Sequence, residues 1–232
     1  MPGEKTPLFG NNPHNKNMKP ITTNPSTATS VAGKLLEIEA IKLNYKSPFT
    51  WSSGWKSPIY CDNRLSLSYP EIRTYIKEAL AATIQGHFGK ADYVAGVATA
   101  GIAQGALVAD KLGLPYVYVR PKPKEHGMGN QIEGRIEKGK KVVLVEDLIS
   151  TGGSSLKAAK ALQEAGCKVI GMVAIFTYGF EVAENNFIQA KIPLVCLSDF
   201  KALLHAAVQQ KYIGEDDLIH VKSWRLDPAH WK

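Results

Sequence analysis

From Tyr69 onward, two kinds of apolar pattern alternate along the chain. Short runs of branched and aromatic residues predict strands, and longer stretches with apolar residues at helical spacing predict helices between them. Strands are expected at Tyr93–Val97, Tyr116–Val119, Val142–Val145, Val169–Phe176 and Leu194–Leu197. Helices are expected after Pro70 and at Ile102–Leu112, Ser155–Ala165, Val182–Ala190, and, on the outside, Phe200–Gln210 and Glu215–Arg225. This order predicts an α/β fold with a parallel sheet and helices on both faces.

The first 68 residues do not follow this alternation. Residues 1–30 are rich in Pro, Asn, Thr and Ser without apolar periodicity, which predicts a disordered tail. Met18 is an alternative start of the natural chain, in which case residues 1–17 are not native. Val31–Leu43 has helical spacing, and Phe49–Asp62 is strand-like and aromatic. We therefore expect a tail (1–30), an N-terminal helix with a small appended segment (31–68) and an α/β core with C-terminal helices (69–232).

Composition excludes several classes of protein. A chain of 232 residues that is 44% hydrophobic suits one α/β domain with a smaller element. No apolar run approaches the ~20 residues of a membrane span, and no secretory signal is evident. The cysteines are odd in number and widely spaced, which favours a reducing cytoplasm over a disulfide framework or metal site. They are Cys61, Cys167 and Cys196.

The net charge of +7 raises the question of a nucleic-acid partner. The basic residues are scattered, apart from Arg120, Lys122 and Lys124, and form no stripe interleaved with aromatic residues. A small polyanionic substrate therefore explains the charge better than nucleic acid does.

The segment from Val142 to Ser154 is the most informative in the chain. Four branched apolar residues predict a strand buried on both faces, and Glu146 and Asp147 are expected at its end. A loop of small and hydroxyl residues then leads into a helix, and such a loop binds anions through free backbone N–H groups. Carboxylates beside it can accept hydrogen bonds from sugar hydroxyls and stabilise positive charge on a ribose. The combination indicates a ribose 5-phosphate site; the alternative is an ordinary strand–turn–helix unit with a polar loop.

This order of residues resembles the phosphoribosyl diphosphate signature of the type I phosphoribosyltransferases. The resemblance implies that Asp147 acts in catalysis and that the whole segment binds phosphoribosyl diphosphate. Its residues are Glu146, Asp147, Leu148, Ile149, Ser150, Thr151, Gly152, Gly153 and Ser154. The spacing fits neither a P-loop nor a dinucleotide-binding fingerprint.

A second polar segment, from Arg120 to Gly134, is longer than an ordinary α/β connection. It is either a solvated charged loop or a mobile lid over an anion. It resembles the catalytic loop of orotate phosphoribosyltransferases, in which Arg-x-x-x-Lys-x-His-Gly closes over the diphosphate. By this resemblance Arg120, Lys124 and His126 bind the diphosphate, Lys124 and His126 are catalytic, and His126 is a candidate proton donor.

Two further segments are similar to the same family. Residues 51–64 resemble its orotate-binding hood, where Tyr60 and Cys61 would provide a flat wall and backbone groups, and Lys56 a cation; the alternative is an edge hairpin with core aromatics. Gly96–Ile102 resembles the turn that holds the diphosphate, here through Thr99 and Ala100. Taken by itself, this turn is weak evidence for a diphosphate site.

The resemblance implies transfer of ribose 5-phosphate to orotate, giving orotidine 5′-monophosphate and diphosphate. It also implies Mg²⁺ bound mainly through substrate oxygens and water, no dedicated protein metal site, and a homodimer that shares its loops between active sites. Other family members carry an arginine for the orotate carboxylate, which has no counterpart here near Thr177 and Tyr178; Lys56 and the Ser150 hydroxyl are the candidates. The alternatives are another base phosphoribosyltransferase and a non-catalytic regulator that binds phosphoribosyl diphosphate.

Overall fold

The computed structural model of the chain describes residues 21–51, 54–122 and 131–231. The strands are β1 Ile21–Thr22, β2 Ile41–Leu43, β3 Phe49–Thr50, β4 Lys56–Ser57, β5 Ile59–Cys61, β6 Tyr93–Val97, β7 Tyr116–Val119, β8 Ile132–Glu133, β9 Lys141–Ile149, β10 Lys168–Thr177 and β11 Leu194–Asp199. The helices are α1 Pro25–Glu37, the 3₁₀ helix η1 Asn63–Ser68, α2 Pro70–Phe88, α3 Gly101–Leu112, α4 Gly153–Glu164, α5 Glu181–Ala190, α6 Phe200–Gln209 and α7 Leu218–Leu226. Within these ranges, none of the helices combines the length and apolar character that crossing a membrane requires.

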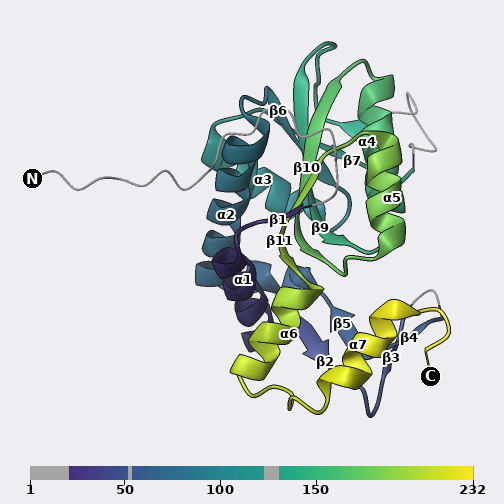
Figure 1. Cartoon of the computed structure of the whole chain (residues 1–232). Coiled ribbons are helices and arrows are strands. Elements are labelled where there is room, and N and C mark those ends of the chain that lie inside the picture. The colour runs from purple at the N-terminus through teal and green to yellow at the C-terminus, as the bar shows by residue number, and fades with distance from the viewer. Residues whose placement is uncertain (1–20, 52–53, 123–130, 232) are drawn as a thin grey trace, which may run out of the picture.

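The main sheet has seven described strands in the order β1-β11-β10-β9-β6-β7-β8. All pair in parallel except β8, which is antiparallel to β7. Helices cover both faces, with α2 and α3 on one side and α4 and α5 on the other (Figure 1). The expected α/β fold with a mostly parallel sheet is confirmed; β1 and β8 at its two edges were not expected.

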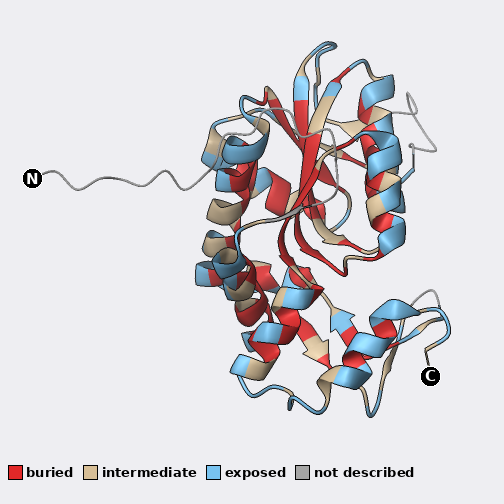
Figure 2. Cartoon of the chain, viewed as in Figure 1, coloured by how far each residue is buried: buried red, intermediate tan, exposed pale blue. Residues whose placement is uncertain are grey.

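Alternate residues of β9 explain why the sheet needs cover on both sides. Val143 and Val145 pack into the cluster that includes α2 and α3, whereas Val142 and Leu144 pack into the cluster that includes α4. All four are fully buried, as a strand in the middle of a parallel sheet requires. Figure 2 shows the same buried centre between two partly exposed helical layers.

The N-terminal boundaries differ from those expected. Helix α1 begins at Pro25 and not at Val31, because Asn24 caps it by accepting a 2.9 Å hydrogen bond from the backbone N–H of Thr27. Residues 25–30 therefore do not belong to a disordered tail. The helix ends at Glu37, and Ile41–Leu43 forms β2 instead of continuing it.

A small lobe lies at the carboxyl end of the main sheet (Figure 1). It contains the antiparallel pairs β2–β5 and β3–β4. Helix α7 belongs to this lobe, because its fully buried Trp224 packs edge-on against Trp51 and donates a 3.2 Å hydrogen bond from Nε1 to the carbonyl of Lys56. The last helix thus covers the small lobe, where it had been expected on the outside of the core.

Candidate active site

The acidic pair lies within β9, not beyond its end. The strand continues to Ile149 because Leu148 and Ile149 pair with Phe176 and Thr177 of β10. The backbone carbonyl of Ile149 also accepts hydrogen bonds from the Thr177 hydroxyl (3.2 Å) and from the amide of Tyr178 (3.2 Å). The pair is therefore fixed by the sheet itself.

The two acids have different environments. Glu146 is 5% exposed, and its two carboxylate oxygens accept 2.9 Å hydrogen bonds from the amide of Asp147 and from the hydroxyl of Ser155 on α4. Asp147 is half-buried. Glu146 therefore joins strand to helix from inside, and Asp147 presents the more accessible carboxylate.

Burial also sets the ionisation of this pair. Burial raises the pKa of Glu146 well above its usual range, and the negative charge of Asp147 raises it further. Burial likewise raises the pKa of Asp147, although hydrogen bonding and the nearby charge of Arg64 oppose this change. A positive charge that develops next to this pair would favour the ionised form of the more accessible Asp147.

The loop after β9 can bind a phosphate. Gly152 has a φ of +78°, and an added Cβ would lie 2.6 Å from Phe187, so glycine is needed here. Helix α4 starts at Gly153, two residues before the expected Ser155, and no side chain caps its first turn. Thr151, Gly153 and Ser154 are exposed. Free amides at an uncapped helix start form an anion site.

Sequence reasoning missed a residue that supports this loop. Asn186 of α5 donates a 2.9 Å hydrogen bond from Nδ2 to the carbonyl of Thr151. The two residues are 35 positions apart, and no motif links them.

The turn between β6 and α3 lies against the acidic pair. A Cβ added to Gly101 would come within 2.5 Å of the Val145 carbonyl oxygen and 3.4 Å of the Glu146 Cα. Thr99 is exposed in this turn, and the peptide bond between Ala98 and Thr99 is cis. The structure thus brings the two small-residue turns to the same edge of the sheet, as expected for parallel strands.

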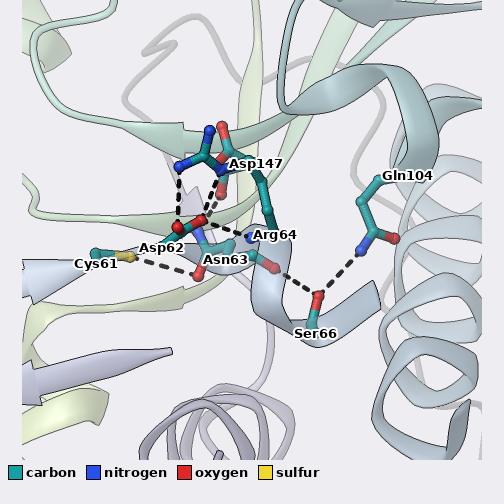
Figure 3. Close-up of polar contacts among 7 residues, drawn as sticks. All are labelled: Cys61, Asp62, Asn63, Arg64, Ser66, Gln104 and Asp147. Atoms are coloured by element: carbon teal, nitrogen blue, oxygen red, sulfur yellow. Dashed lines mark hydrogen bonds and ion pairs between the residues drawn. The ribbon is translucent and has the colours of Figure 1, made fainter. Parts of the chain in front are cut away.

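The small lobe is tied directly to the acidic strand. Asn63, which is 1% exposed, donates a 2.8 Å hydrogen bond from Nδ2 to the backbone carbonyl of Asp147 (Figure 3). Its Oδ1 accepts a 3.4 Å hydrogen bond from the thiol of Cys61. Burial raises the pKa of Cys61 well above its usual range, and the charge of Asp147 adds to this effect. Cys61 and Asp147 are therefore linked through the side chain of Asn63.

The contact continues through η1 into the core. The backbone carbonyl of Asn63 accepts a 2.6 Å hydrogen bond from Ser66, whose oxygen accepts a 3.2 Å hydrogen bond from Nε2 of Gln104 on α3. Sequence reasoning missed Asn63, Ser66 and Gln104. The available signal was the polar run Asp-Asn-Arg directly after Tyr60 and Cys61.

The remaining hood residues are spread more widely. Tyr60 is 40% exposed, beside the half-buried Cys61 on β5. Lys56 lies on the β3–β4 hairpin, and its Nζ donates a 2.7 Å hydrogen bond to the hydroxyl of Thr50. Trp51 packs against Tyr178 and bonds the Ile59 carbonyl through Nε1, so it belongs to the aromatic core of the lobe.

Of the loop residues, the structure describes the base. The backbone of Arg120 pairs with Gln131 through a 2.9 Å and a 2.8 Å hydrogen bond, and its Nη1 lies 3.4 Å from Oε1 of Glu133. These contacts join the two ends of the loop. Lys124 and His126 lie outside the described residues.

Known proteins share this arrangement. The family described as "Phosphoribosyl transferase domain" matches residues 67–191. The orotate phosphoribosyltransferase of Bacteroides fragilis is 58% identical over 201 residues, covering 87% of this chain and 95% of the relative. That of Listeria innocua is 52% identical, covering 89% and 99%. The crystal structure of the enzyme from Aeropyrum pernix is 29% identical, with a TM-score of 0.69 over 79% of this chain and 99% of that one. The chain therefore belongs to the orotate phosphoribosyltransferase family, within the type I phosphoribosyltransferases.

Proposed function

We propose that the protein transfers ribose 5-phosphate from phosphoribosyl diphosphate to orotate, giving orotidine 5′-monophosphate and diphosphate in pyrimidine biosynthesis. The observation that carries the proposal is the hydrogen bond from Asn63 to the carbonyl of Asp147. It joins the segment that would bind a pyrimidine to the acid that would face the ribose. A phosphate loop and an acid alone would suit any phosphoribosyltransferase, whereas this lobe supports orotate as the acceptor.

Each part of the site has one role in this reaction. The amides and hydroxyls of residues 150–154 bind the 5′-phosphate, because an uncapped helix start attracts an anion. Asp147 accepts hydrogen bonds from the ribose hydroxyls, and its charge stabilises the oxocarbenium character that develops as diphosphate leaves C1′. Glu146 accepts a hydrogen bond from the backbone amide of Asp147 and so helps to fix the strand at the acid.

A second set of residues, apart from the phosphate loop and the acidic pair, would bind the leaving diphosphate. Thr99 and Ala100 lie in the turn that would approach it with backbone groups, and Arg120, Lys124 and His126 would neutralise its charge. His126 would donate a proton to it. Tyr60 and Cys61 would form the wall for the orotate ring, with Ser150 as a further hydrogen-bonding group.

We expect Mg²⁺ to be held mainly by substrate oxygens and water. Both Glu146 oxygens already accept internal hydrogen bonds, which leaves Asp147 as the carboxylate for a metal-bound water. Magnesium keeps several waters and few protein ligands, and it would neutralise charge on the diphosphate when bound. We infer that the protein acts in the cytoplasm and that it does so as a homodimer.

A base-selectivity assay tests the proposal. The purified protein is incubated with phosphoribosyl diphosphate and Mg²⁺ together with orotate, uracil or adenine, and base consumption is followed by absorbance. We expect that orotate is consumed and that uracil and adenine are not. Orotate consumption should require both phosphoribosyl diphosphate and Mg²⁺. Reaction with uracil or adenine in preference to orotate would assign another phosphoribosyltransferase activity. Binding of phosphoribosyl diphosphate with no turnover of any base would indicate a regulator.

A further inference from the structure

Arg64 lies beside the acidic pair and follows the proposed ring wall of Tyr60 and Cys61 along the chain. It is three residues after Cys61, next to Asn63, and Figure 3 shows its guanidinium group beside Asp147. Hydrogen bonding to Asp62 chiefly raises the pKa of Arg64, and the charges of Asp147 and Tyr60 add to this effect. Arg64 therefore lies beside the acid that would face the ribose.

Asp62 orients the guanidinium group. Its two carboxylate oxygens accept hydrogen bonds from Nε (2.7 Å) and Nη2 (2.9 Å) of Arg64. Asp62 also accepts a 3.2 Å bond from the Arg64 amide at the start of η1, so it is itself fixed. The side chain of Asp62 is 17% exposed and that of Arg64 is 59% exposed. The aspartate is thus the anchored partner, and the arginine reaches toward solvent.

One edge of the guanidinium group remains for a ligand. Asp62 uses Nε and one hydrogen of Nη2, and no described residue accepts a hydrogen bond from Nη1. The remaining Nη1–Nη2 edge has the planar, two-donor geometry that matches a carboxylate.

Three other cations near the site, Arg225, Lys56 and Arg120, are engaged elsewhere. Arg225 donates from Nε to the Tyr178 carbonyl (3.0 Å) and from Nη2 to the Gly179 carbonyl (2.5 Å). Lys56 bonds Thr50 within its own hairpin. Arg120 pairs with Glu133 at the base of its loop.

Charge explains why a cation is needed at this point. Orotate carries a carboxylate beside the ring nitrogen that reacts, so this group must approach the ribose and the Glu146–Asp147 pair. Like charges close together in a partly buried site repel strongly. A positive group beside Asp147 would offset this repulsion.

We infer that Arg64, oriented by Asp62, binds the carboxylate of orotate and selects orotate over uracil. The inference rests on the proposed function and adds the specificity residue that the motifs do not supply. The anion that Arg64 binds is assigned to the base and not to the diphosphate, because Arg64 follows Tyr60 and Cys61 closely along the chain and its guanidinium group lies beside Asp147.

Two nucleotides that differ only in this carboxylate provide the test. Affinities of the full chain for orotidine 5′-monophosphate and uridine 5′-monophosphate are measured by calorimetry for the wild type, Arg64→Gln and Arg64→Lys. The wild type should prefer orotidine 5′-monophosphate. Arg64→Gln should reduce that preference roughly ten- to a hundredfold, the range for a charged hydrogen-bonded pair, with little change for uridine 5′-monophosphate. Arg64→Lys should retain part of the preference for orotidine 5′-monophosphate, because lysine keeps the positive charge but lacks the planar pair of donors of the guanidinium group.

The matched control is Arg135→Gln, which removes the same charge from an exposed arginine before β9. It should leave the preference unchanged. Equal weakening of both nucleotides by Arg64→Gln would indicate a structural role, and an unchanged preference would show no contact; either result overturns the inference. A raised KM for phosphoribosyl diphosphate with an unchanged KM for orotate would assign Arg64 to the diphosphate and also overturn it.

The same titrations separate this inference from the proposed function. Wild-type protein that binds neither nucleotide, or that does not prefer orotidine 5′-monophosphate, would contradict the proposed function and with it the inference. Wild-type preference that survives in Arg64→Gln would contradict the inference alone.

Discussion

The side-chain amide of Asn63 donates a 2.8 Å hydrogen bond to the backbone carbonyl of Asp147, across 84 positions of sequence. Asn63 follows the strand that carries Tyr60 and Cys61, and Asp147 lies near the carboxyl end of β9. A displacement of the small lobe would therefore move the acid as well. Because turnover depends strongly on the geometry of reacting groups, this contact matters for catalysis as well as for folding.

We predict that Asn63→Asp lowers turnover by roughly tenfold or more, because a displacement of about 1 Å can cost 10²-fold. The substitution keeps the shape of the side chain but places a buried carboxylate against the carbonyl of Asp147. Steady-state kinetics with both substrates measure the effect. Asn44→Asp is the control, since Oδ1 of the exposed Asn44 accepts a hydrogen bond from the amide of Ser47 and aspartate can do the same. Equal kinetics for both variants would remove the positioning role of Asn63.

Asp147→Asn should lower turnover by about 10²- to 10³-fold, because its charge acts on the transition state. The KM for phosphoribosyl diphosphate should change much less, since the phosphate loop is untouched. Asp92→Asn is the matched control: Asp92 accepts a 2.8 Å hydrogen bond from the amide of Lys141 at the opposite end of β9. A pure binding defect with turnover intact would refute the electrostatic role of Asp147.

Glu146→Gln should stabilise the protein at neutral pH. Burial raises the pKa of Glu146, so above its ordinary value the unfolded state releases a proton that the folded state retains. Stability is therefore lost as pH rises toward the folded pKa, and glutamine avoids this loss. We expect a gain of about 1 kcal/mol, or roughly 2–4 °C in Tm, at pH 7 to 8. The gain should disappear below about pH 4, near the unperturbed pKa of glutamate.

Thermal unfolding across this pH range tests that expectation. Glutamine can still accept from the Asp147 amide and face Ser155, so the two internal contacts are retained. Glu164→Gln serves as the control, because Glu164 is exposed at the end of α4 and forms a surface ion pair with Lys160 at 3.7 Å. A Glu146→Gln variant less stable than the wild type at pH 8 would show that the hydrogen bonds of the charged form dominate.

The proposed dimer makes a further prediction. If the loop of one subunit serves the site of the other, Lys124 acts in trans and Asp147 acts in cis. Inactive Lys124→Ala and inactive Asp147→Asn subunits are mixed under conditions that allow exchange. Half of the dimers are then mixed, and each contains one intact site, so activity should recover to about a quarter of wild type. Exchange confirmed by mass spectrometry with no recovery of activity would contradict the shared site.

Periodicity located the core accurately. Strands β6 and β7 have the bounds that the apolar pattern predicts, because buried parallel strands are almost wholly apolar. The start of α1 was missed because residues 25–30 are polar or small and show no apolar face. The Asn-Pro pair at 24–25 marked that helix start and was the better signal.

The site was predictable only where its residues are consecutive. The segment from Glu146 to Ser154 runs without interruption from the end of β9 through a turn into α4, so its order along the chain is also its order in space. The contacts of Asn63, Ser66 and Gln104 depend on how the small lobe docks, and side chains far apart in sequence carry no such signal. Arg64 was not predicted as a site residue for the same reason, because its position beside Asp147 depends on how the small lobe docks.

A crystal structure of the protein with orotidine 5′-monophosphate would test the central claim most directly. The account predicts the 5′-phosphate on the amides of residues 151–154, the ribose hydroxyls on Asp147 and the pyrimidine ring against Tyr60 and Cys61. One bound molecule would thus touch the loop, the acid and the small lobe together. A nucleotide bound with its phosphate away from this loop, or with its ring away from the small lobe, would contradict the account.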